Sequence, residues 1–251
     1  MIATLKAELR KIYNIRSTYA ILLFSLVLML IFAFWVEGIK AGENGRAVTD
    51  SGKLAGLLLD AITNLAFWGA IVGILSVTHE YRYNTIVYTL TASRSRSRVL
   101  LSKIIAVSLF AVFFSIFVSV FAVALMYLGL AIKGVSLSHQ VLPLDLIWRI
   151  LFVGWGYSMG GLLLASLIRQ QVGSIVAFFV LPNLVEALVG LLLKDNKMYL
   201  PFTSLQQVTK VQNTELRHTL SHGRAALVFG VYLIVGWIVA WYLFLRRDAT
   251  T

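Results

Sequence analysis

The sequence predicts an all-α polytopic membrane protein with six transmembrane helices. Of its 251 residues, 59% are hydrophobic and only 13% are charged, whereas an average soluble domain is about a quarter charged. Six apolar segments reach the roughly 20 residues that a helix needs to cross a bilayer core about 30 Å thick. Their apolar runs are continuous, whereas the strands of a membrane barrel alternate. Because backbone groups in lipid must be hydrogen-bonded within their own segment, we expect helices.

The expected spans are residues 18–36, 54–77, 104–132, 146–168, 172–193 and 225–245. The third is long enough to tilt or to project beyond the bilayer. The first resembles an uncleaved anchor, because its apolar core is longer than that of a signal peptide and Phe34-Trp35-Val36 is no small-residue cleavage site. We expect the whole chain, residues 1–251, to form one transmembrane domain.

Residues 1–16 precede the first span and have an amphipathic pattern. Ile2, Leu5, Leu9 and Ile12 recur at helical spacing, and lysine and arginine lie on the other side. This predicts an elbow helix that lies in the inner membrane interface. The alternative is a short basic tail.

The distribution of lysine and arginine predicts the orientation. With the N-terminus inside, the cytoplasmic segments hold twelve basic residues and only three acids, whereas six acids offset the ten basic residues outside. Both termini are therefore expected in the cytoplasm, and the protein in the inner or plasma membrane.

Several kinds of chemistry are disfavoured. The net charge of +11 lies at the edges of apolar runs, which is typical of a membrane topology signal and not of nucleic-acid binding. There is no cysteine, so we expect no disulfide framework, no thiol catalysis and no thiolate metal site. There is no GxxxxGK[ST] loop, so we expect no ATP hydrolysis by this chain alone. We expect no catalytic residue and no metal site in this chain.

One catalytic pattern, Gly156-Tyr157-Ser158-Met159-Gly160, fits G-x-S-x-G and is similar to the serine motif of rhomboid-type intramembrane proteases. Such a serine needs a histidine base within hydrogen-bond reach, yet His222 sits at the outer mouth of the sixth span. The same residues form a GxxxG helix-packing face, as do Gly69 and Gly73 in the second span.

Polar residues within the spans mark a possible translocation path, because ionisable groups are costly in lipid. Asp60 and Asn64 share nearly one face of the second span. In the fifth span Glu186 follows Pro182-Asn183, and a proline there can kink the helix. Alternatively, Asp60 and Asn64 lie near the outer interface and Glu186 pairs with a neighbouring helix. The outer loop, residues 194–224, could fold back partly into the membrane as a short helical hairpin.

The most informative segment is the cytoplasmic insert, residues 79–103, between the second and third spans. Its apolar Ile86, Val87 and Leu90 and its Arg/Ser run suggest a short surface helix followed by a loop. On physical grounds it is either a basic anchor for anionic lipid or a docking helix for a soluble partner.

The insert resembles the corresponding segment of ABC transporter permeases of the type-2 exporter class. The residues that carry the resemblance are Glu80-Tyr81-Arg82, Thr85-Ile86, Leu90, Arg98, Leu101 and Lys103. Tyr199-Leu200-Pro201 is similar to bacitracin- and lantibiotic-export permeases. Asn84 replaces the usual glycine but tolerates left-handed geometry better than most residues. The proline often found before the arginines is missing.

This resemblance implies a permease that works with a separate ATP-hydrolysing subunit, which binds ATP and magnesium, and with either a second permease copy or a related permease. The insert would be the coupling helix, with Glu80, Arg82, Thr85 and Arg98 at or near the ATPase. Arg169 and Gln170 would belong to the second cytoplasmic contact. The implied function is outward transport of an amphipathic peptide or antibiotic, or else of sodium or a small drug. An intramembrane serine protease and a non-transporting membrane scaffold are the competing interpretations of the chain.

Overall fold

The computed structural model describes residues 2–14, 16–39, 59–64, 66–93, 95–134, 144–210 and 219–246. These ranges contain helices and no strand, which confirms the all-α prediction. Six helical segments are long and apolar enough to cross a membrane, namely Arg16–Trp35, Leu59–Arg82, Arg96–Ile132, Leu146–Ile168, Gln171–Tyr199 and His222–Arg246. They correspond one to one to the six expected spans.

The helices follow one another along the chain with few breaks. Their bounds are α1 Ile2–Asn14, α2 Arg16–Met29, the π-helical η1 Leu30–Ile39, α5 Gly69–Arg82, α6 Ile86–Ser93, α7 Arg96–Ile132, α8 Leu144–Ile168, α9 Gln171–Val180, the π-helical η2 Leu181–Val185, α10 Glu186–Leu193, the 3₁₀-helical η3 Lys194–Tyr199, α11 Pro201–Gln207 and α12 His222–Arg246. The third span is the longest of these helices, as expected.

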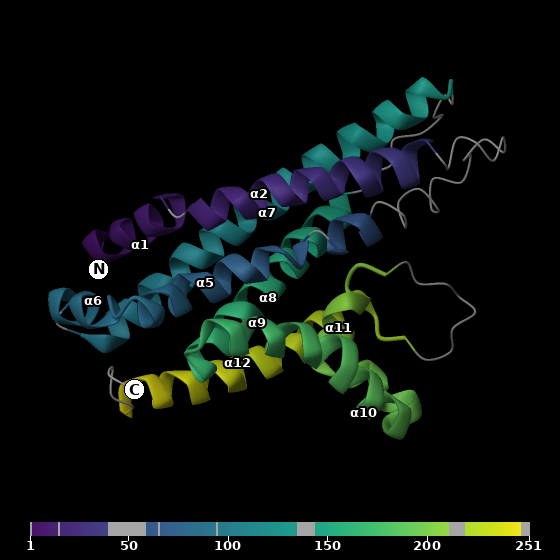
Figure 1. The fold of residues 1–251 in the computed structure, drawn as a ribbon. Helices are drawn as coiled ribbons and strands as arrows, with labels where there is room; N and C mark the ends of the chain where they lie inside the picture. The colour runs from purple at the N-terminus through teal and green to yellow at the C-terminus, as the bar shows by residue number, and fades with distance from the viewer. Residues whose placement is uncertain are drawn as a thin grey trace.

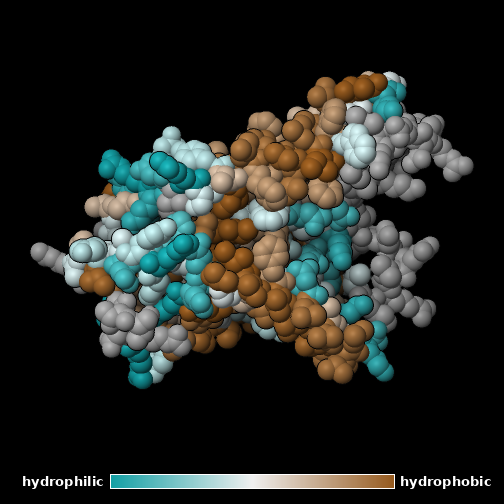
Figure 2. All heavy atoms as spheres, viewed as in Figure 1, coloured by the Kyte–Doolittle hydropathy of each residue, from teal (hydrophilic) through white to brown (hydrophobic). Residues whose placement is uncertain are grey.

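The spans form an elongated bundle around α8 (Figure 1). α5 and α12 pack against α8, and α2 with η1 packs along α7. The N-terminal helix α1, the short helix α6 and the C-terminal end of α12 gather at one end of the bundle. Hydrophilic side chains cover that end, whereas a broad apolar band crosses the middle of the visible face (Figure 2). Both described chain ends therefore lie on the same side of the apolar band.

Small residues let α5 and α8 cross closely. A Cβ atom on Gly73 would lie 2.5 Å from the Ser158 carbonyl oxygen, and one on Gly161 would collide with the Ala70 carbonyl. Gly156 lies under the side chain of Leu205 from α11. The glycines of both GxxxG patterns are thus at helix-packing surfaces, as the packing interpretation predicts.

The fifth span changes its winding at Pro182. Proline lacks the N–H that would continue the α-helical ladder, and the chain here forms the wider η2 before α10 resumes. After η3 the chain returns as α11, which packs against α12 and α8 and buries Phe202 and Leu205. The described part of the outer loop thus folds back onto the bundle. Residues 211–218 of that loop lie outside the described residues.

The helices that flank the insert, residues 79–103, extend further than the expected spans. α5 continues to Arg82, and α7 already begins at Arg96, so the Arg/Ser run is mostly helix and not the expected loop. Arg94 lies outside the described residues. The expected second span ended at Val77 and the expected third span began at Ile104, so both stopped short of Glu80 and Lys103. These two residues pair with each other. Paired charges can be buried where a single one could not, so both helices continue past them.

Candidate functional site

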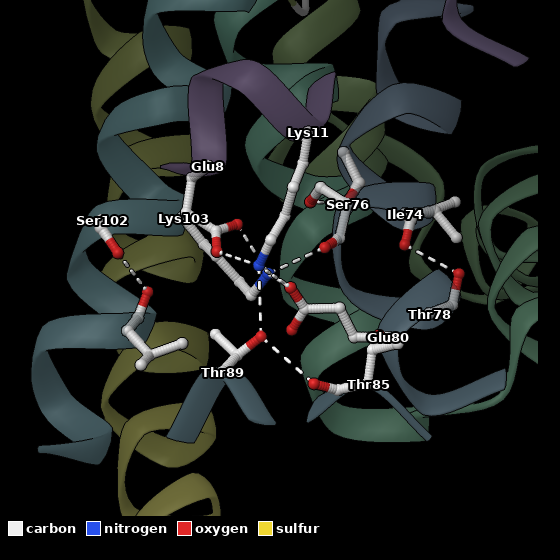
Figure 3. Close-up of polar contacts among 12 residues, drawn as sticks. Glu8, Lys11, Ile74, Ser76, Thr78, Glu80, Thr85, Thr89, Ser102 and Lys103 are labelled. Carbon is white, nitrogen blue, oxygen red and sulfur yellow. Dashed lines mark hydrogen bonds and ion pairs between the residues drawn. The ribbon is translucent and has the colours of Figure 1, made fainter. Parts of the chain in front are cut away.

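Four charged side chains meet where α1, α5 and α7 converge. They are Glu8 and Lys11 of α1, Glu80 of α5 and Lys103 of α7, and we call them the charge quartet. The Lys11 Nζ lies 2.7 Å from Glu8 Oε1 and 2.5 Å from Glu80 Oε1. The Lys103 Nζ lies 2.8 Å from Glu8 Oε2 and 2.8 Å from Glu80 Oε1. Each ammonium thus bridges both carboxylates (Figure 3).

Three members of the charge quartet are almost entirely buried, and Lys11 is partly buried. Lys103 is 1% exposed, Glu8 3% and Glu80 5%. Burying an unpaired charge is very costly, and here two positive and two negative charges compensate one another. Lys103 donates a further hydrogen bond to the Ser76 carbonyl, at 3.0 Å. The arrangement therefore joins the elbow helix to the second and third spans. Loss of one buried partner would leave an uncompensated charge in the interior, which costs a large free energy.

Lys11 is the most accessible member of the charge quartet. Partial burial disfavours its charged form, but the carboxylates of Glu80 and Glu8 outweigh this, so the pKa of Lys11 is raised above the ordinary lysine value. Its ammonium also donates to Thr89 Oγ1 at 3.2 Å. This hydrogen bond connects the charge quartet to α6.

The turn between α5 and α6 is closed by a residue in left-handed geometry. Asn84 has a φ of 52°, and the Thr85 N–H donates to the Glu80 carbonyl at 2.9 Å. Asparagine is one of the few residues besides glycine that enters this region readily, so Asn84 can serve where the resembled permeases have glycine. Ile86 is buried directly after the turn, which seats α6 on the end of the bundle.

The outer face of α6 and its flanks is exposed. Tyr83, Val87 and Tyr88 present large side chains to the surroundings. Of the expected ATPase contacts, Arg82, Thr85 and Arg98 are also exposed. Glu80 differs, because its carboxylate points into the charge quartet. The Glu80 side chain therefore faces the protein interior and not the surface on which an ATPase contact was expected.

The turn between α8 and α9 touches the end of α5. Arg82 Nη1 donates to Gln171 Oε1 at 3.0 Å. The Arg169 guanidinium lies 5.2 Å from the centroid of the Tyr81 ring and 5.9 Å from that of Phe244. Gln170 is exposed beside them. The two segments expected to meet an ATPase are therefore neighbours in space.

A cavity of about 480 Å³ opens among α2, η1, the residues between 61 and 68 that precede α5, and α8, α9, η2 and α11. Its lining includes Asn64, Pro182 and Asn183, three of the expected path residues, together with Thr63 and Tyr157. The side chains that line it in the described part of the chain carry no formal charge. The cavity therefore offers amide and hydroxyl groups among aromatic rings.

Asp60 and Glu186, the two charged residues of the expected path, do not line this cavity. Glu186 instead accepts hydrogen bonds from the backbone N–H groups of Phe202 and Thr203, at 2.6 and 2.7 Å, and from the Thr203 hydroxyl. A carboxylate at a helix N-terminus is favourable because it pairs with the free N–H groups there. Glu186 thus caps α11, which agrees with the alternative that it pairs with a neighbouring helix.

Comparison with known families decides the class of protein. The model of the family described as "ABC-2 family transporter protein" matches residues 4–190, about three quarters of the chain. The chain belongs to this family. ABC-2 permeases are the membrane subunits of transporters, and they normally work with an ATPase subunit. The matched range includes the charge quartet, α6 and the turn between α8 and α9. The comparison with curated proteins gives no match.

In this ABC-2 permease Ser158 is in a packing environment. It is fully buried, and its hydroxyl donates to the Gly154 carbonyl at 3.0 Å. His222, at the start of α12, lies 3.4 Å from the Gln207 carbonyl. Across the described ranges no group of three metal-ligating side chains is present.

Sequence reasoning identified Glu80 and Lys103 in this ABC-2 permease but missed Glu8 and Lys11 as their partners. One signal was available. Glu8 lies between Leu5 and Ile12 at helical spacing, so it falls on the apolar face of the amphipathic helix. An acid on a face that packs against the bundle requires a buried cation. Lys103, which directly precedes the expected third span, is such a cation.

Proposed function

We propose that this chain is the permease subunit of an ABC exporter in the inner or plasma membrane. A separate subunit would bind ATP and magnesium and hydrolyse the ATP, and two permease copies would form the transport pathway. The observation that carries this proposal is the attachment of α6. Through Thr89, Lys11 and the charge quartet it is joined to α1, α5 and α7.

This attachment supports a mechanical role for α6. A closing ATPase that pushes on the exposed Tyr83, Val87 and Tyr88 would displace α6 against the end of the bundle. Because the charge quartet holds three helices at one point, the displacement would move them as a rigid unit. The neighbouring turn at Arg169 and Gln170 offers a second contact on the same ATPase.

The cavity lined by Asn64, Pro182 and Asn183 supports the proposed path. Aromatic walls with neutral polar groups suit an amphipathic peptide or antibiotic better than a bare ion such as sodium. Glu186 is assigned to the α11 cap, and Asp60 remains outside the cavity lining. Direction from inside to outside follows from the family resemblance.

The test is co-purification with the ATPase. The tagged chain is expressed with a neighbouring gene that encodes GxxxxGK[ST], and the complex is isolated in mild detergent. Tyr88→Asp and Arg98→Glu, on the exposed surface, should release the ATPase while the permease stays monodisperse. Tyr199→Asp, an exposed tyrosine of η3, is the matched control and should retain it. Survival of the complex in both surface variants would place the contact elsewhere.

A transport measurement separates the candidate substrates and the scaffold interpretation. Proteoliposomes that contain the complex should hydrolyse ATP faster when an amphipathic peptide antibiotic is added, and sodium should have no such effect. Stimulation by sodium alone would reverse the substrate assignment. A chain that binds no ATPase and stimulates no hydrolysis would instead be a membrane scaffold.

A further inference from the structure

An apolar groove of about 570 Å³ runs between α7, α8 and α12. Its lining includes Trp155 of α8, Trp237 and Trp241 of α12, and Ile104 of α7. Ile234 and Ile238 at its edge are mostly exposed. These residues belong to membrane-crossing helices, so the groove faces the lipid.

One end of the groove carries two arginines. Tyr242 and Leu245 line the groove at the C-terminal end of α12. The Arg246 guanidinium lies 4.3 Å from the centroid of the Tyr242 ring. Arg96 Nη1 donates to the Leu245 carbonyl at 3.3 Å. The groove is therefore apolar along its walls and basic at its mouth.

We propose that this groove binds one anionic phospholipid, with an acyl chain along the tryptophans and the phosphate at Arg96 and Arg246. In the expected orientation the mouth faces the cytoplasmic leaflet, where anionic lipids attract basic side chains. A helix of a second chain fits less well. A helix about 10 Å across fills roughly 400 Å³ per turn, so the groove accommodates little more than one turn.

Bromine-labelled lipids test the proposal, because three of the six tryptophans line the groove. The purified chain is placed in phosphatidylcholine nanodiscs that contain a minor fraction of brominated phosphatidylglycerol. Tryptophan fluorescence should be quenched more strongly than by the same fraction of brominated phosphatidylcholine. The triple variant Trp155→Phe, Trp237→Phe, Trp241→Phe should lose this extra quenching.

Charge variants locate the headgroup. Arg96→Gln and Arg246→Gln should each weaken the preference for phosphatidylglycerol about fivefold. Arg224→Gln removes the same charge from the other end of α12 and should leave the preference unchanged.

Two outcomes would overturn the proposal. Equal quenching of the wild-type chain by the two brominated lipids would do so without any variant. The second outcome has two parts: neither brominated lipid quenches the tryptophans, and the Ile238→Cys variant forms a cross-linked dimer. A second copy of the chain would then fill the groove.

Discussion

The Lys103 Nζ lies 2.8 Å from Glu80 Oε1, so the first turns of α7 are bonded to the last turn of α5. The insert between them is thus closed at its base by an ion pair. Glu8 and Lys11 add the elbow helix to the same pair. The insert therefore projects from a fixed base and is not a free loop.

Removal of Lys103 is expected to destabilise the protein strongly. Lys103→Met leaves Glu80 and Glu8 buried with only Lys11 between them, and breaking such a buried pair costs about 3–5 kcal/mol. The melting temperature in detergent should fall accordingly. Lys6→Met, which removes an exposed charge from α1, should have little effect.

The double variant Glu80→Gln, Lys103→Met distinguishes charge balance from packing. It retains the Glu8–Lys11 pair and should recover most of the lost melting temperature. A double variant as unstable as Lys103→Met would show that the long lysine side chain, and not its charge, is needed.

Lys11 should react more slowly than Lys6 with amine-directed reagents. Its pKa is raised by the carboxylates of Glu80 and Glu8 despite partial burial, so less of it is a neutral amine at any given pH. A group whose pKa is raised on folding stabilises the native state fully below its unfolded value, about 10.4. That contribution should be lost only as the pH rises through the folded-state pKa. Mass spectrometry after brief acetylation measures both sites, and equal rates would contradict the ion pairs.

Substitution of Glu186 should affect the stability of the protein, whereas substitution of Asn183 should affect transport. Glu186→Ala leaves the N–H groups of Phe202 and Thr203 without their acceptor, which should cost about 2 kcal/mol. Asn183→Leu in the cavity should preserve the melting temperature and change transport in proteoliposomes. If Glu186→Ala abolished transport with an unchanged melting temperature, the charge would belong to the path after all.

The crossing of α5 and α8 should not tolerate a large side chain. Gly161→Leu would drive the leucine into the Ala70 backbone, so we expect loss of the folded protein on size-exclusion chromatography. Gly230→Leu is the matched control, because nothing lies near that glycine.

Ser158→Ala should behave quite differently from Gly161→Leu. It removes only the hydrogen bond to Gly154 and should change stability by about 1 kcal/mol. A fluorophosphonate that labelled Ser158 in the wild-type chain would revive the protease interpretation.

Asn84 should accept glycine but not valine. Its φ of 52° lies in the left-handed region, which costs a β-branched residue about 1–2 kcal/mol or more. Asn84→Val should therefore lower the melting temperature and weaken ATPase binding, and Asn84→Gly should leave both nearly unchanged. An Asn84→Val variant that bound the ATPase normally would argue against a fixed turn.

The number of spans could be predicted from hydropathy because it is a local property of the chain. The same holds for the surface helix at Ile86, since its apolar residues recur within one turn. The left-handed tolerance of Asn84 was also local, and the structure confirms its use. The boundaries of α5 and α7 could not be predicted in this way, because they depend on the tertiary ion pair between Glu80 and Lys103.

Roles were harder to predict than positions. Glu80 was expected at the insert from its motif, but a motif does not show which way a carboxylate points. Glu186 was recognised as a costly intramembrane charge, yet its partners belong to α11, which reaches it only after the outer loop has folded back. Such contacts join segments that are distant in the sequence. The periodic pattern of apolar residues in a single sequence does not predict which distant segments meet.

Helix α7 is long enough to transmit a movement from one side of the membrane to the other. Its 37 residues span about 55 Å, well beyond a bilayer core of about 30 Å. The charge quartet holds this helix at Lys103, about 10 Å from the end that begins at Arg96. A tilt of about 10° around the midpoint would swing each tip by roughly 5 Å in opposite directions. A small push at α6 would thereby arrive at Ile132, on the far side of the membrane, as a movement of comparable size and reversed sense.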